Sequence, residues 1–239
     1  MEDRSREQAA QATAPATQGA PDMQASLGMV AALAGIAMLS GILIAVVFEW
    51  TLPVIKANKA RALRQSVFEV LPGAKQVVTW KLMEDGTVQV LQGEDEKAVK
   101  FYAGYLDDGA LAGVAIEAQG QGFQDVIKVI YGYAPDSEQV VGMRVLESKE
   151  TPGLGDKIGL DPAFLANFQD LDVRLDGDGK KLRQTLKVVK QGTRAEKWEI
   201  DAITGATISS KAIGRMMNES TATRLPQVRR NLDTLREAP

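Results

Sequence analysis

The chain has 239 residues with 28 basic and 31 acidic side chains, and its formal net charge of −3 gives no indication of nucleic-acid binding. It contains no Cys and no His, which excludes disulfides, thiolate catalysis, Cys-bound iron–sulfur clusters, His-ligated haem or metal, and a Ser-His-Asp triad. Any redox chemistry would therefore need an organic cofactor.

The N-terminal part combines a polar tail with one long apolar run. Residues 1–25 are rich in Gln, Ala, Thr and Pro, so we expect a disordered tail. Residues 26–48 carry no charge, and as a helix they would span roughly 34 Å, enough for a hydrocarbon core of about 30 Å. We predict a transmembrane helix. A cleaved signal peptide is the alternative, but no small-residue cleavage site follows before Glu49.

The flanking charges of this helix indicate an orientation. Two basic residues precede it, whereas four follow it, namely Lys56, Lys59, Arg61 and Arg64. The positive-inside rule would then place the large domain in the cytoplasm. Small residues on one face of the helix, Gly28, Gly35 and Gly41 among them, favour close packing on other membrane helices.

A helix and then a series of strands are predicted next. Residues 49–70 read as a linker helix that Leu71-Pro72-Gly73-Ala74 ends. Six strand-like segments separated by turn residues follow it, at 77–82, 88–92, 99–105, 111–118, 126–133 and 140–146. The last two are expected to form a hairpin.

Two short stretches resemble ligand loops without meeting their requirements. Gly120-Gln121-Gly122-Phe123 looks like a glycine-rich nucleotide loop, but the sixth position is Asp125 and no helix follows, so we reject a dinucleotide site. Asp176-Gly177-Asp178-Gly179 looks like the start of a calcium loop, but the twelfth position is Lys187, which predicts a plain hairpin turn.

The C-terminal third begins with a short helix at Asp161-Pro162. Residues 186–191 and 197–203 are expected to pair as the last strands, and a helix from Ile208 should fade near Thr221. Residues 224–236 have apolar side chains at helical spacing. We expect a solvated terminal helix there, with a contact to a partner subunit as the alternative.

The corner between the last strand and its helix is the candidate site. A helix N-terminus has unpaired N–H groups and positive dipole charge, which suit a phosphate. Gly205 and Ala206 remove side-chain bulk beside Thr207. Two interpretations stay open: Thr207 or Ser209 is an N-cap, or the hydroxyl carries or holds a phosphorylated group.

Two motifs give these residues a family resemblance. Asp201-Ala202-Ile203-Thr204-Gly205-Ala206-Thr207 resembles the flavinylation motif of FMN-binding domains, in which Asp, two residues and Ser/Thr-Gly-Ala precede the acceptor Thr or Ser. Glu150-Thr151-Pro152-Gly153-Leu154-Gly155 resembles a segment of the G subunit of the Rnf (Rsx) electron-transport complex. The C subunit of the sodium-translocating NADH:quinone reductase has a similar segment. The resemblance covers about residues 62–220 and the preceding membrane helix.

The resemblance implies a covalent cofactor. FMN would be joined by its phosphate to Thr207 through a phosphoester, and a separate flavin transferase that uses FAD and magnesium would attach it. Asp201 would be recognised by that transferase, although it could instead pair with Lys211 or cap a turn. Lys211 would neutralise phosphate charge or simply be a solvent-exposed lysine. The other implied cofactor-binding residues are Thr204, Gly205, Ala206, Ser209 and Ser210 around Thr207, and Glu150, Thr151, Pro152, Gly153, Leu154 and Gly155 over the flavin ring.

The function implied by the resemblance is a flavinylated electron carrier in a bacterial inner membrane. Its complex would couple electron transfer between ferredoxin and NAD to sodium or proton movement, with a second flavin-bearing membrane subunit among its partners. The flavin domain would face the periplasm, against the charge count. The alternatives are a quinone-reductase C subunit, a free-standing extracytoplasmic flavin reductase, and a non-redox anchored binding module. Residues 208–213 look more like the Rnf pattern.

These segments predict an α+β fold, in which a single transmembrane helix precedes a mainly antiparallel sheet with flanking helices. The expected organisation is a tail (1–25), a transmembrane helix (26–48), a linker helix (49–70), the FMN-binding domain (71–222) and a C-terminal helix or tail (223–239).

Overall fold

The N-terminal part of the structure is one continuous helix, α1, which spans Met23–Val70. The computed structural model describes residues 23–93, 95 and 97–237, so most of the expected tail lies outside the described residues. Residues 23–25 of that tail belong to α1, and the helix continues through Phe48 and past Pro53.

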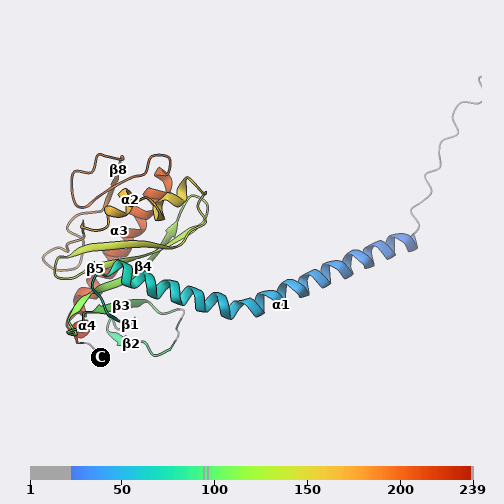
Figure 1. Cartoon of the computed structure of the whole chain (residues 1–239), viewed down its shortest axis with the longest axis horizontal. Coiled ribbons are helices and arrows are strands. Elements are labelled where there is room, and N and C mark those ends of the chain that lie inside the picture. Colours follow the sequence, from blue (N-terminus) through green and yellow to red (C-terminus); the bar gives the residue numbers. More distant parts are fainter. Residues whose placement is uncertain (1–22, 94, 96, 238–239) are drawn as a thin grey trace, which may run out of the picture. The chain divides into compact units, whose positions relative to one another are not determined.

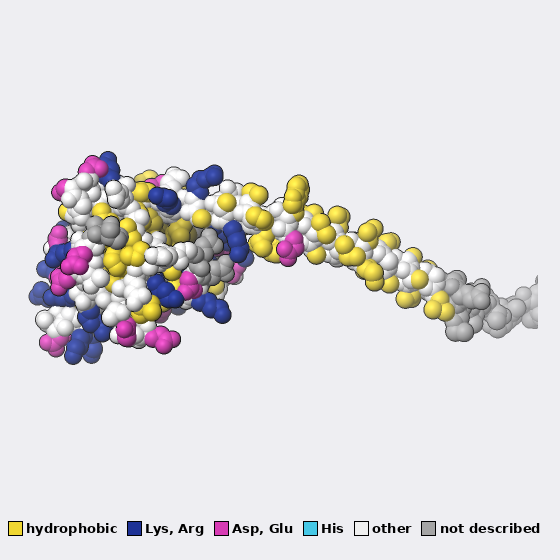
Figure 2. All heavy atoms as spheres, turned by 90° about the horizontal axis from the view of Figure 1, so that it is seen from below, with side chains coloured by type: hydrophobic (Ala, Val, Ile, Leu, Met, Phe, Trp, Pro, Cys, Tyr) yellow, Lys and Arg dark blue, Asp and Glu magenta, His cyan; other side chains and the backbone are white. Residues whose placement is uncertain are grey.

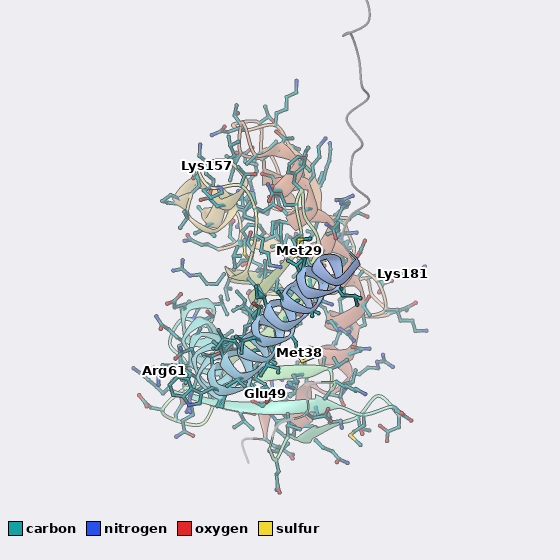
Figure 3. All side chains as sticks on the ribbon, turned by 90° about the vertical axis from the view of Figure 1, so that its right-hand side faces the viewer. Met29, Met38, Glu49, Arg61, Lys157 and Lys181 are labelled. Carbon is teal, nitrogen blue, oxygen red and sulfur yellow. The ribbon has the colours of Figure 1, made fainter. Side chains whose placement is uncertain are left out.

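The first half of α1 presents apolar side chains to the outside along its length (Figure 2), and Met29 and Met38 lie on it ahead of Glu49 (Figure 3). From Leu27 onward the helix is long and apolar enough to cross a membrane, judged by length and composition. The chain divides into two units between Ala57 and Asn58.

The second unit is built on an antiparallel sheet with strand order β2-β1-β3-β4-β5-β6-β7 among the described residues. The strands are β1 Gln76–Leu82, β2 Val88–Val90, β3 Lys100–Tyr105, β4 Leu111–Gln121, β5 Val126–Ala134, β6 Gln139–Glu147 and β7 Leu171–Asp172. The predicted hairpin of the fifth and sixth strands is present as β5 and β6. The predicted α+β class is confirmed.

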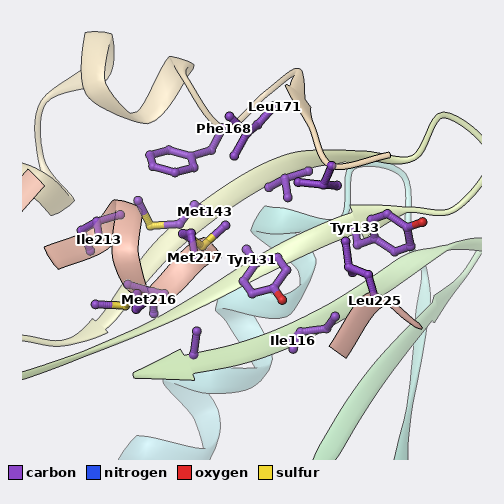
Figure 4. Close-up of a cluster of buried hydrophobic side chains, with 14 of the residues drawn as sticks. Ile116, Tyr131, Tyr133, Met143, Phe168, Leu171, Ile213, Met216, Met217 and Leu225 are labelled. Atoms are coloured by element: carbon purple, nitrogen blue, oxygen red, sulfur yellow. The ribbon is translucent and has the colours of Figure 1, made fainter. Parts of the chain in front are cut away.

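Each face of the sheet is covered by helix, because alternate strand residues point to opposite faces. On β5, Val129, Tyr131 and Tyr133 join the core against helix α3 (Thr207–Arg230), whereas Ile130 packs with the end of α1. Figure 4 shows Ile213, Met216 and Met217 of α3 facing the sheet, and Figure 1 shows the end of α1 on its opposite side.

The end of α1 packs against the sheet at strand positions that are occupied by glycine. A Cβ on Gly132 would lie 1.9 Å from the Val70 carbonyl oxygen, and one on Gly104 would lie 2.8 Å from Leu71 Cδ1. Gly132 pairs with Gly142, whose added Cβ would lie 3.0 Å from Val70 Cα. These glycines therefore form a groove across the strands in which Val70 and Leu71 are seated.

Smaller elements connect the sheet to α3. They are a 3-10 helix, η1 (Gly155–Gly159), helix α2 (Pro162–Ala166), strand β8 (Lys187–Val189) and strand β9 (Glu199–Asp201). Helix α2 begins at Asp161-Pro162 as predicted, and Asp161 caps it by accepting from the backbone of Ala163 and Phe164. Strands β8 and β9 pair in parallel, as a separate ladder. Asp176 closes the predicted turn by accepting from the Lys180 N–H at 2.9 Å.

The C-terminal segment corrects two expectations. Helix α3 does not fade near Thr221 but continues to Arg230, and α4 (Leu232–Arg236) follows. The segment is not solvated: Val228 and Leu235 are 0% exposed, and the Tyr105 hydroxyl donates to the Leu235 carbonyl at 2.8 Å. Burial of these apolar side chains stabilises the helix beyond the point where its sequence becomes polar.

Candidate functional site

The corner between β9 and α3 exposes the hydroxyl-bearing residue that ends the first motif. Thr207 is the first residue of α3 and is exposed, and Gly205 before it has φ +87°. The N-cap residue is Ala206, and it makes no side-chain cap bond. The interpretation of Thr207 or Ser209 as the N-cap is therefore wrong.

The two hydroxyls that follow Thr207 in α3, those of Ser209 and Ser210, point into the protein. Ser210 is fully buried, where its Oγ accepts from the Ile203 N–H at 3.1 Å and donates to the Ala206 carbonyl at 2.9 Å. These bonds fix the shape of the corner. Ser209 is also buried, and its hydroxyl donates to a carboxylate oxygen of Glu150.

The bond from Ser209, two residues after the first motif, joins this corner to Glu150 of the second motif, 59 residues away in the chain. Glu150 follows β6 and is 6% exposed. Its other oxygen accepts from the backbone N–H groups of Phe123 and Gln124, at 2.8 and 3.1 Å. One buried carboxylate thus connects the end of β6, the start of α3 and the turn between β4 and β5.

That β4–β5 turn is a third wall of the site, and the motif reasoning did not identify it. Gln124 Nε2 donates to Thr151 Oγ1 at 2.8 Å, and Lys149 pairs with Asp125 at 2.5 Å. The hydrogen bond and charge of Lys149 lower the pKa of the Asp125 carboxyl. The sequence signal was Gly122, rejected above only as part of a dinucleotide loop. A Cβ there would lie 2.5 Å from Glu150 Oε1.

The three walls enclose a pocket of about 300 Å³. Its lining includes the predicted site residues Glu150, Thr151, Leu154, Gly155, Gly205, Ala206, Thr207 and Ser209, and the remaining lining residues are Phe123 and Ile208. Three large apolar side chains on its walls are unusually exposed, Phe123 at 61%, Leu154 at 51% and Ile208 at 55%. Exposed apolar side chains grouped around a cavity indicate a ligand or partner.

The pocket fits the flavin that the motifs imply. A flavin has a planar, largely apolar ring, which the three exposed apolar side chains can contact. Its phosphate is an anion, and the hydroxyl of Thr207 stands at a helix N-terminus, where N–H groups and the helix dipole favour an anion.

Several of the predicted site residues lie outside this pocket. Lys211 is exposed and lines a neighbouring groove of about 490 Å³ together with Lys187 and Arg215. Asp201 caps a turn, since its carboxylate accepts from the backbone of Thr193 at 3.1 Å and Arg194 at 2.9 Å. The remaining residues outside the pocket lining are Pro152, Gly153, Thr204 and Ser210.

Comparisons with known proteins point in the same direction. A family model described as FMN-binding domain matches residues 122–222, from the β4–β5 turn through both motifs. The G subunit of an ion-translocating oxidoreductase complex from Methanosarcina acetivorans is 29% identical over 171 residues, which cover 72% of this chain and 79% of that protein. The G subunit of the Na(+)-translocating ferredoxin:NAD(+) oxidoreductase complex of Acetobacterium woodii is 31% identical over 155 residues, 64% of this chain and 69% of that protein.

A solved structure shares the fold. The crystal structure of NqrC from Shewanella oneidensis matches with a TM-score of 0.60 at 20% identity, and the match covers 76% of this chain and 100% of that one. At this identity the likeness concerns the fold alone.

Proposed function

Because the chain belongs to the family of G subunits of ion-translocating oxidoreductase complexes, we propose that it is a membrane-anchored electron carrier whose FMN is joined to Thr207 by a phosphoester bond. The observation that carries the proposal is the pocket in which the two motifs meet, with the exposed Thr207 at its edge.

Each wall of the pocket would have a separate task in holding the cofactor. Thr207 and the first turn of α3 would bind the phosphate, and Phe123, Leu154 and Ile208 would contact the ring. The Thr151 hydroxyl would form a hydrogen bond with the polar edge of the flavin ring. Bound FMN would supply reversible electron uptake and release, while these residues orient it and keep part of its environment dry.

The chain has no His beside Thr207 to act as a base, so self-attachment would need another base, and we propose that a separate flavin transferase attaches the cofactor. The Thr207 oxygen would form a bond to the flavin phosphate of FAD, and the bond to the adenylate phosphate would break. AMP would leave, and the hydroxyl proton would pass to a base of the transferase. An FMN that is covalently attached in this way cannot dissociate from the protein between electron transfers.

Intact-mass analysis with in-gel flavin fluorescence tests the proposal. We expect the chain from its own membrane to carry the mass of one esterified FMN, Thr207→Ser to keep it and Thr207→Ala to lose it. Thr223→Ala is the matched control, because Thr223 is an exposed threonine on the same helix, lies outside both motifs and does not line the pocket, and it should remain flavinylated. Fluorescence that persists in Thr207→Ala would show that the acceptor is another residue. A native chain without flavin would favour the non-redox binding module.

The proposed partners are the other subunits of an Rnf-type complex, including a second flavin-bearing membrane subunit. Relatives named as G subunits of ion-translocating oxidoreductase complexes favour this assembly over the quinone reductase. Electron transfer between ferredoxin and NAD coupled to sodium or proton movement would be the activity of the whole complex. Identification of the subunits that co-purify with the chain separates these two assemblies and the free-standing reductase.

We also propose that the flavin domain lies on the periplasmic side of the inner membrane, with the helix at 27–48 as its anchor. The absence of Cys makes this directly measurable, since an introduced cysteine is unique. A membrane-impermeant maleimide added to intact spheroplasts should label Gln184→Cys, on an exposed part of the domain, and should not label Ser5→Cys. The opposite pattern would support the orientation given by the charge count.

A further inference from the structure

Glu150 occupies an unusual place for a carboxylate. It is 6% exposed, and its three hydrogen-bonding partners come from two other segments of the chain, the backbone of Phe123 and Gln124 and the hydroxyl of Ser209. It also lines the pocket that contains Thr207. A buried carboxylate is costly unless hydrogen bonds compensate for its lost hydration.

The space around this carboxylate is kept open by two glycines. An added Cβ would lie 2.5 Å from Glu150 Oε1 at Gly122 and 2.6 Å from Glu150 Oε2 at Gly155. The backbone of the β4–β5 turn and that of Glu150's own segment therefore lie directly against the carboxylate. Loss of its hydrogen bonds would release the β4–β5 turn that carries Phe123 and the segment that carries Leu154.

Every hydrogen bond that the structure gives the Glu150 carboxylate is donated to it. The two backbone N–H groups can only donate, and both donate to Oε1. Ser209 lies in the first turn of α3, where the helix dipole stabilises negative charge. In a site partly shielded from water, a negative charge on Glu150 interacts more strongly with nearby groups than it would in bulk water.

We infer that Glu150 is a positioning residue with an electrostatic role: its hydrogen bonds hold the three walls of the pocket together, and its negative charge lowers the reduction potential of a flavin on Thr207. The inference depends on the proposed function. Reduction adds negative charge to the flavin, so a fixed anion in the same pocket makes reduction less favourable.

The test separates charge from position with two variants of the full chain. In Glu150→Gln, the amide oxygen can accept from Phe123 and Gln124, and the amide nitrogen can donate to Ser209, so the charge is lost while the hydrogen bonds remain. In Glu150→Asp, the charge remains but the shorter side chain cannot reach all three partners. Redox titration gives the flavin potential, and amide hydrogen exchange of the chain produced without the transferase reports the β4–β5 turn.

Glu199→Gln is the matched control. Glu199 is also buried, at 7% exposure, and its carboxylate also accepts from two consecutive backbone N–H groups, those of Ala195 and Glu196. It does not line the pocket.

We expect Glu150→Gln to shift the flavin potential to a more positive value with amide exchange like that of the native chain. Glu150→Asp should keep a potential close to native, while the Phe123 and Gln124 amides exchange faster. Glu199→Gln should leave the potential unchanged. An unshifted potential in Glu150→Gln, an equal shift in Glu199→Gln, or a Glu150→Gln chain that is unfolded or not flavinylated would overturn the inference. If the native chain carries no FMN on Thr207, the proposed function itself fails.

Discussion

At the scale of single residues, three hydroxyls at the start of α3 have three different environments. Thr207 is exposed at the pocket, Ser209 is bonded to Glu150, and Ser210 holds the corner through Ile203 and Ala206. The motif indicates Thr207 as the acceptor, and the burial of the other two hydroxyls supports that proposal, because a buried hydroxyl with partners is poorly placed to react.

Gly155 determines how closely the two motifs approach, and its substitution gives a sharp prediction. In Gly155→Ala, the new Cβ would lie 2.6 Å from Glu150 Oε2 and 2.9 Å from Ser209 Oγ. We expect a loss of about 1–3 kcal/mol in the free energy of unfolding, as for other overpacked sites, together with less FMN per chain. Denaturant unfolding and intact mass measure the two effects.

Gly177→Ala is the control for this substitution, because no atom lies within 4 Å of an added Cβ there. It should be neutral or slightly stabilising, since Ala restricts the unfolded chain. Equal stability of the two variants would mean that the segment after β6 adjusts freely around Gly155.

At the scale of elements, the contact between the end of α1 and the sheet depends on strand glycines. Gly132→Ala would place a Cβ 1.9 Å from the Val70 carbonyl oxygen, which is backbone and cannot rotate away. We expect this variant to lose at least about 1–3 kcal/mol of stability. Gly142→Ala, where the closest atom is Val70 Cα at 3.0 Å, should cost less. A reversed order in thermal unfolding would contradict the groove as described.

The elements themselves were largely predictable, but their ends were not. The strands from β1 to β6 and the cap of α2 follow local signals, namely period-2 alternation and the Asp-Pro start. The continuation of α3 to Arg230, past Pro226, depends on tertiary burial of Leu225 and Val228. Local sequence in that region is polar enough to suggest that the helix ends earlier.

At the scale of the whole molecule, we predict a stability that is flat near neutral pH and falls on both sides. The chain has no His, so no side chain of ordinary pKa titrates near pH 6–7. On the acid side, the hydrogen bonds from Arg174 lower the pKa of Asp172 below its usual 3.8. A lowered carboxyl pKa stabilises the folded state above pH 3.8, and this stabilisation is lost as the pH falls through the lower, folded value.

On the alkaline side, burial raises the pKa values of Tyr131 and Tyr133 above the usual 10.0. The folded state then keeps these protons longer than the unfolded state does, so its stabilisation is complete below pH 10.0 and declines above it. Denaturation of the detergent-solubilised chain from about pH 3 to 11 checks both limbs. Asp172→Asn should flatten the acid limb, and Tyr133→Phe the alkaline one. A marked transition near about pH 6.5 would show that another group dominates.

Residue types at short, fixed spacings are enough to predict the apolar helix, the α+β class and the two motifs. The packing of the folded chain, in contrast, brings Glu150 to Ser209, places Phe123 and Ile208 on the pocket walls, and leaves Lys211 outside the pocket. Glu150 and Ser209 are far apart in the chain, as are Phe123 and Ile208, so their contacts depend on how strands β4 to β6 and α3 pack. The C-terminal residues are buried for the same reason. Their apolar side chains pack on an apolar face of the sheet, and the local pattern of residues 224–236 does not indicate that such a face is available.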